Sequence, residues 1–173
     1  MAQDHSRSKQ WRGYFGIGAE RISKPLNLGN LIRSAHAFGA SFVFTIGAEP
    51  DAFDFKSDTS KAGAHLPYYH WESLDGMRLP RDCRLVGVEL MAESVDLPSF
   101  AHPVQAAYVL GPERGALSPE LVARCDHLVR IPTEFCINVA MAGAIVMYDR
   151  MRVLGRFPPR PLTVGMPRSA KKV

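Results

Sequence analysis

Three consecutive segments near the start of the chain read GYFGIG (13–18), NLGNLIRSAHAFG (27–39) and SFVFTIG (41–47). The first and third are short apolar runs, as in buried strands, whereas the second repeats its apolar residues at the spacing of a helix face. We expect this helix to open at Asn27, a capping residue, and to end at Gly39. A strand, a helix and a strand in this order predict a βαβ unit, and therefore an α/β fold with a parallel sheet.

The rest of the chain extends this pattern. A helix is marked by Ser118 as N-cap and Pro119 in its first turn. The less regular region after the βαβ unit holds a short predicted helix near 57–64. The strand-like runs are RLVGVELM (84–91), AAYVLG (106–111) and HLVRIP (127–132). The further helical segments are SPELVARC (118–125) and INVAMAGAIVMYDRMRVL (137–154).

The last of these helices, 137–154, has an apolar surface nearly all round, which is typical of a buried helix. A domain of this size has too little surface elsewhere to bury it completely, so the pattern favours a second subunit. The apolar run of 135–148 is too short for a membrane span, which needs about 20 residues. We therefore expect no membrane segment.

The chain has 173 residues, the size of one domain, and its charge is uneven. Residues 1–24 carry five Lys or Arg against two acidic residues, and residues 150–173 carry seven against none. We expect a folded domain over 13–155 between flexible basic tails at 1–12 and 156–173. Such tails suit a polyanion such as nucleic acid, although they equally fit a pair of solvated ends.

The cysteines indicate the compartment. Cys83, Cys125 and Cys136 are odd in number and form no CxxC motif, so we expect neither a disulfide framework nor a zinc site. Reduced cysteines and a polar amino terminus predict a cytoplasmic protein without a signal peptide. The six histidines show no metal-ligand spacing, and we expect no metal.

Three loops carry the polar residues that chemistry would need, at positions where α/β sheets place their sites. The first joins Asn27 to Arg33; taken alone, it favours the reading as a capped helix with a surface arginine. The second, GPERGALS (111–118), sets Glu113 in a sharp glycine-framed turn, or is a plain connection. The third is IPTEFCINV (131–139), in which Cys136 and Asn138 are either site residues or a small thiol and a helix cap.

Together the loops resemble the three motifs of the SpoU/TrmH branch of SPOUT RNA methyltransferases. NLGNLIRSAHAFG resembles motif 1, with its Asn and Arg six residues apart, and LGPERGALSPEL resembles motif 2 with its Glu. RIP followed by CINVAMAGAIVMYDR resembles motif 3, which leads into a long helix. The resemblance spans about 13–154.

This resemblance implies a parallel-sheet SPOUT fold with a deep C-terminal trefoil knot that holds S-adenosylmethionine (SAM). It also implies a homodimer and methyl transfer to a ribose 2′-OH of tRNA or rRNA. Arg33 would stabilise the 2′-oxygen beside the partner's cofactor. Carried over by motif position, the other site residues are Asn27, Glu113, Cys136 and Asn138, with Val88, Glu89, Leu110, Gly111, Ile131 and Ile137 at the cofactor.

Two departures keep other functions open. The chain has Cys136 where the family usually has serine, and the link from Ile131 to Cys136 is short. A non-catalytic RNA-binding protein on the same fold and a base methyltransferase are the alternatives. A dinucleotide enzyme is disfavoured, because the GxGxxG pattern that begins at Gly16 has Arg21 at its third glycine position. The aromatic run Tyr68, Tyr69 and Trp71 either stacks on bases or, as we expect, packs in the core or an interface.

Overall fold

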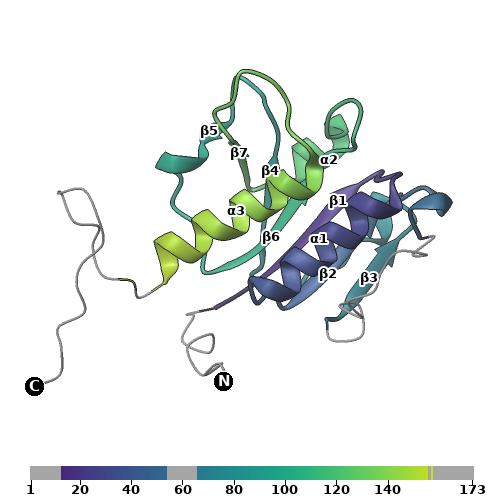
Figure 1. The fold of residues 1–173 in the computed structure, drawn as a ribbon, viewed down its shortest axis with the longest axis horizontal. Helices are drawn as coiled ribbons and strands as arrows, with labels where there is room; N and C mark the ends of the chain where they lie inside the picture. Colours follow the sequence, from purple (N-terminus) through teal and green to yellow (C-terminus); the bar gives the residue numbers. More distant parts are fainter. Residues whose placement is uncertain (1–12, 54–65, 156, 158–173) are drawn as a thin grey trace, which may run out of the picture.

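The computed structural model describes residues 13–53, 66–155 and 157 (Figure 1). The predicted helix near 57–64 and nearly all of the two tails lie outside these residues. Within the described part, the helices are α1 (Pro25–Ala37), α2 (Pro119–Arg124) and α3 (Val139–Leu154). The strands are β1 (Tyr14–Glu20), β2 (Phe42–Ile46), β3 (Tyr68–Trp71), β4 (Arg84–Val88), β5 (Val95–Asp96), β6 (Gln105–Leu110) and β7 (His127–Arg130).

The strands form one sheet in the order β3-β2-β1-β6-β4-β7-β5, and every neighbouring pair is parallel. This confirms the predicted α/β fold with a parallel sheet. Two glycines of β1 explain how closely its neighbour β2 packs. A Cβ on Gly16 would lie 2.2 Å from the ring of Phe42, and one on Gly18 would lie 2.5 Å from the ring of Phe44. The two phenylalanine rings thus occupy the space that a side chain at either glycine position would need.

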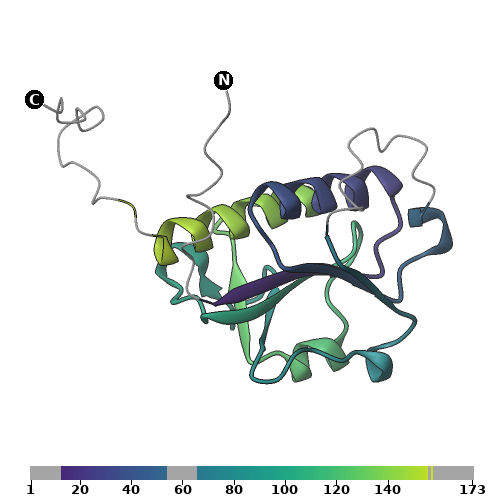
Figure 2. The same cartoon turned by 90° about the horizontal axis from the view of Figure 1, so that it is seen from below.

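The helices divide between the faces of the sheet (Figure 2). Helices α1 and α3 lie together on one face, and α2 lies on the other. The larger core cluster fills the α1–α3 side and includes the fully buried Ile17, Leu31 and Val146. A smaller cluster on the opposite side contains Phe44 and Leu121.

Helix α3 is anchored near its carboxyl end by a buried guanidinium. Arg150 is 4% exposed and donates hydrogen bonds to the backbone oxygens of Pro103, Val104 and Tyr14 and to the hydroxyl of Tyr108. The backbone partners precede or begin the neighbouring strands β1 and β6, and Tyr108 lies within β6. One side chain therefore fixes the carboxyl end of α3 across both strands. The amino end of α3 points toward the other end of these strands (Figure 1).

Several predicted boundaries need correction. Helix α1 begins at Pro25, because proline fits the first helical turn, so Asn27 lies inside the helix and is buried. Strand β4 ends at Val88 rather than at residue 91. The short strands β3 and β5 were not predicted. Ser118 caps α2 as expected, by accepting a hydrogen bond from the backbone N–H of Leu121.

The aromatic run lies on β3, an edge strand. Trp71 packs against the smaller core cluster, and the ring of Tyr69 stacks on that of Trp71 with centroids 6.1 Å apart. Tyr69 nevertheless keeps half of its surface exposed. None of the helices in the described part of the chain is long and apolar enough to cross a membrane.

Two helical glycines form a matched pair for testing the α1–α3 packing. A Cβ on Gly143 would lie 2.5 Å from Cδ1 of the fully buried Leu31, whereas one on Gly29 would meet nothing within 4 Å. Gly29→Ala should stabilise the protein by about 0.5–1 kcal/mol through helix propensity. Gly143→Ala should destabilise it by about 1 kcal/mol, because overpacking outweighs that gain. Urea unfolding measures both; equal stabilisation by the two substitutions would contradict close packing at Gly143.

Candidate functional site

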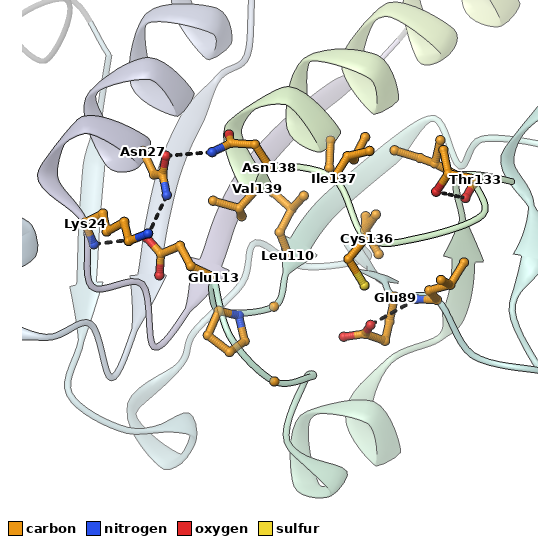
Figure 3. Close-up of a pocket in the computed structure, with 17 residues that line it drawn as sticks. Lys24, Asn27, Glu89, Leu110, Glu113, Thr133, Cys136, Ile137, Asn138 and Val139 are labelled. Atoms are coloured by element: carbon orange, nitrogen blue, oxygen red, sulfur yellow. Dashed lines mark hydrogen bonds between the residues drawn. The ribbon is translucent and has the colours of Figure 1, made fainter.

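A cavity of about 310 Å³ opens where β4, β6 and β7 end and α1 and α3 begin (Figure 3). In parallel sheets this edge is where ligands bind. Its walls come from the three loops singled out in the sequence together with the turn after β4. The volume lies at the lower end of the range for small-molecule pockets.

Glu113, in the loop after β6, joins that loop to the start of α1. Its Oε2 accepts hydrogen bonds from the backbone N–H and the hydroxyl of Ser23, both at 3.1 Å. Its Oε1 accepts from the backbone N–H of Lys24 and from Nδ2 of Asn27, both at 3.0 Å. The carboxylate therefore ties the loop after β6 to the two residues that precede α1 and to Asn27, while the N-cap residue of α1, Lys24, makes no side-chain cap bond.

Asn27 passes this hydrogen bonding on to α3. Its Oδ1 accepts a hydrogen bond of 2.9 Å from Nδ2 of Asn138 (Figure 3). Oδ1 of Asn138 accepts from the backbone N–H groups of Ala140 and Met141 and so caps α3. Because backbone N–H groups only donate, this cap fixes the orientation of both amides. We call the chain Glu113–Asn27–Asn138 the amide relay; it links all three motif loops.

The relay favours the ionised form of Glu113. Burial raises the pKa of this carboxyl, but the hydrogen bonds from Asn27 and from backbone N–H groups, including those of Ser23 and Lys24, lower it more. The net pKa lies below its ordinary value. A carboxylate with four donors and a low pKa is a poor proton acceptor, so its role in this site is to hold the loops in place.

Glu89 and Gly111 shape the opposite wall. Oε2 of Glu89 accepts from the backbone N–H of Leu117 at 2.8 Å, and Oε1 accepts from that of Leu90 at 3.0 Å. A Cβ on Gly111 would lie 3.1 Å from Oε2 of Glu89 and 3.3 Å from the backbone nitrogen of Leu117. A side chain there would crowd this junction, which explains the glycine at the end of β6.

Ten of the eleven predicted site residues line this cavity. Arg33 does not: it is exposed on α1, outside the cavity wall. Cys136 lines the cavity and is exposed. The residues that the structure brings together are Asn27, Glu113, Cys136 and Asn138 with Val88, Glu89, Leu110, Gly111, Ile131 and Ile137.

The site and its support also contain residues that were not predicted as site residues, among them Lys24, Thr133, Glu20 and Arg21. Lys24 and Thr133 line the cavity. Glu20, 4% exposed at the end of β1, accepts from the backbone N–H of Ser118 at 2.7 Å and from its hydroxyl. Arg21 has a positive φ of 50° and donates to the backbone oxygen of Ala116 at 2.9 Å. Of these residues, only Glu20 could have been noticed in the sequence, as an acidic residue at the end of an apolar strand. The contacts of the others join segments far apart in the chain, and local sequence patterns do not reveal such contacts.

This arrangement suits a ligand with an apolar body and few polar groups. Apolar side chains such as Val88 and Ile137 and the exposed backbone at Gly111 offer packing and hydrogen bonds, while Lys24 brings a positive charge to the cavity. Within the described residues no group of His, Cys, Asp and Glu side chains could hold a metal ion.

Comparison with known proteins places these features in a family. Residues 15–148 match the model of the SpoU rRNA Methylase family. Over 155 residues the chain is 31% identical to the tRNA (guanosine(18)-2′-O)-methyltransferase TARBP1 of Mus musculus, covering 83% of this chain and 10% of the mouse protein. Over 175 residues it is 29% identical to the 23S rRNA (uridine(2479)-2′-O)-methyltransferase of Streptomyces viridochromogenes, covering 92% and 61%. The chain thus spans less than two thirds of each relative.

A solved structure shares both fold and sequence. The AdoMet-bound rRNA methyltransferase from Sinorhizobium meliloti superposes with a TM-score of 0.72 at 27% identity. The match covers 83% of this chain and 57% of the S. meliloti chain. The parallel sheet described above is therefore shared with that enzyme.

The amide relay predicts a specific titration. In Asn27→Ala the Glu113 carboxylate loses a donor, so its pKa should rise, as NMR titration of the Glu113 side chain would measure. Asn30→Ala, an exposed change on the same helix, should leave that pKa unchanged. A depressed pKa stabilises the fold above the unfolded-state pKa, and this contribution is lost as pH falls through the folded-state pKa. The stability gap between wild type and Asn27→Ala should therefore narrow in acid; a constant gap would contradict the relay.

Proposed function

Because the chain belongs to the SpoU rRNA Methylase family, we propose that it transfers a methyl group from SAM to a ribose 2′-OH of tRNA or rRNA. The observation that carries this proposal is the amide relay, which joins all three motif loops around one cavity. The names of the mouse and Streptomyces relatives, a tRNA and an rRNA 2′-O-methyltransferase, support the reaction class.

The groups that line the cavity suit the adenosyl part of the cofactor. The backbone at Leu110, Gly111 and Ile131 would hold the adenosyl group, with Val88 and Ile137 packing against it. Glu89 would close the rim, because both its oxygens already hold neighbouring loops. The S. meliloti relative, solved with AdoMet, supports this assignment. When bound, the cofactor supplies a methyl group on a positively charged sulfur. This sulfur is already a good leaving group.

The protein's chemical task is then to orient the hydroxyl and stabilise its oxygen. We assign that task to Arg33, whose guanidinium would pair with the developing charge on the 2′-oxygen and with a nearby phosphate. Arg33 is exposed and outside the wall of its own cavity. These two observations support action at the cavity of a partner subunit. Cys136 would line the cavity as a weaker hydrogen-bond partner than the serine it replaces.

The proposal includes a homodimer. Met141, Ile145 and Tyr148 recur at helical spacing along α3 and are 59%, 36% and 49% exposed, and Leu26 on α1 is 63% exposed. A row of apolar side chains on two adjacent helices is a surface that a second subunit would cover. The interface would then contain the helix that carries Arg33.

We also propose the trefoil knot, with 13–155 as the methyltransferase domain. The sheet order supports it: β7, formed late in the chain, lies between β4 and β5, and the chain then returns to α3 beside α1. The basic segments 1–12 and 156–173 would bind RNA phosphates without base specificity. The cytoplasmic location stays a prediction.

The reaction is tested by incubating the purified protein with SAM and unmodified tRNA and rRNA pools, then quantifying nucleosides by mass spectrometry. We expect a new 2′-O-methylnucleoside, whose base and pool identify the target. A base-methylated product would replace the proposed reaction with base methylation. SAM binding without any product would favour the non-catalytic RNA-binding alternative.

Arg33→Ala should abolish transfer and leave SAM affinity within about twofold, because the side chain lies outside the cavity. Arg152→Ala, an exposed arginine on α3, is the matched control and should retain activity. Full activity of Arg33→Ala would refute its role.

Mixed dimers test the partner assignment. Arg33→Ala is combined with Gly111→Val, which crowds the cavity, and each variant alone should be inactive. If Arg33 serves the partner's cavity, the heterodimer regains one complete site and measurable activity. If Arg33 serves its own cavity, the mixture stays inactive.

A further inference from the structure

Phe135 is the most exposed large hydrophobic side chain in the described part of the chain, at 74%. It lies two residues after Thr133 and directly before Cys136, both of which line the cavity, but Phe135 itself is outside the wall. Phe135 therefore lies on a loop that forms part of the cavity wall, with its own side chain exposed. A single exposed apolar residue is ordinary on a protein surface, and what distinguishes Phe135 is the loop that holds it.

The loop that presents Phe135 is tied down. The hydroxyl of Thr133 donates to the backbone oxygen of Phe135 at 2.9 Å, and the backbone N–H of Thr133 donates to the oxygen of Ile131 at 2.8 Å. The loop then ends in the Asn138 cap of α3. An exposed ring on a hydrogen-bonded turn loses little further freedom when it binds a flat partner.

The other residues around the cavity indicate what that partner is. Leu90, 42% exposed, lines the cavity beside Glu89. Lys24 and Arg114 are exposed cations, one lining the cavity and the other between two residues that do. Figure 3 places Lys24 on the opposite side of the cavity from Thr133 and Cys136. An exposed aromatic ring on one wall loop and a cation across the cavity match a nucleotide, which has a flat base and a phosphate.

We propose that Phe135 is the stacking platform for the base of the nucleotide whose ribose enters the cavity. The inference rests on the proposed RNA methylation and deepens it. A base presented to an enzyme loses its stacking neighbours in the RNA, and an aromatic side chain replaces them. Such a platform is tolerant of base identity, because every base has a flat face. Phe135 is thus a positioning residue for the ribose, without contact to the reacting atoms.

The test compares Phe135→Ala, Phe135→Leu and Phe135→Trp in the full-length dimer. We expect Phe135→Ala to raise KM for unmodified tRNA or rRNA about tenfold, within the range measured for base–aromatic stacking. Its kcat and its SAM affinity should change by less than about twofold. Phe135→Trp should restore KM, whereas Phe135→Leu should not, because leucine has apolar surface but no ring. Val104→Ala, which trims an exposed residue before β6, is the control.

An unchanged KM in Phe135→Ala, or full rescue by leucine, would overturn the inference. Loss of the dimer in Phe135→Ala would assign the ring to the subunit interface and also overturn it. Binding of a fluorescent unmodified tRNA transcript is measured in parallel. Suppose that wild type transfers no methyl group, while Phe135→Ala weakens this binding and Phe135→Trp restores it. That result would refute the proposed reaction but keep the stacking platform. If wild type is active and Phe135→Ala behaves like it, the stacking platform fails alone.

Discussion

The site depends on one chain of hydrogen bonds, from the Glu113 carboxylate through Asn27 and Asn138 to the first N–H groups of α3. Each member satisfies a group that would otherwise be unpaired: the start of α1, the start of α3 and two amides. Three loops far apart in sequence are thereby fixed to one another. Because the cap of α3 sets the direction of every bond, the relay has one arrangement, and the cavity beside it has a defined shape.

The fold places these loops within reach of one another. The parallel sheet brings the carboxyl ends of β1, β4, β6 and β7 to one edge, where the loops leave the strands. At the far end, Arg150 fixes α3 to the backbone that precedes or begins the central strands. A helix held at both ends positions its cap as firmly as the sheet does. Glu20 adds a second clamp by holding Ser118 and hence the end of the loop after β6.

What the sequence predicted well was local in origin. The α2 start follows from Ser118 and Pro119 alone, and the βαβ unit follows from periodicity within a short segment. What it missed depended on distant partners. Asn27 was placed as a helix cap, whereas its amide is bonded to residues 86 and 111 positions away. Strands β3 and β5 are short and lie at the two edges of the sheet, so they lack the apolar signature of the central strands. The site residues came from the motif resemblance, and ten of the eleven line the cavity, whereas spacing could not place Arg33 outside it.

The relay depends on Asn27 remaining an amide. Asparagine side chains lose ammonia slowly in water and become carboxylates. At Asn27 that change would replace a donor with a negative oxygen 3.0 Å from the Glu113 carboxylate. Two carboxylates at that distance cannot both stay ionised without cost, and one would take up a proton. A chemical change at one buried side chain would therefore weaken the junction at which the three loops are joined.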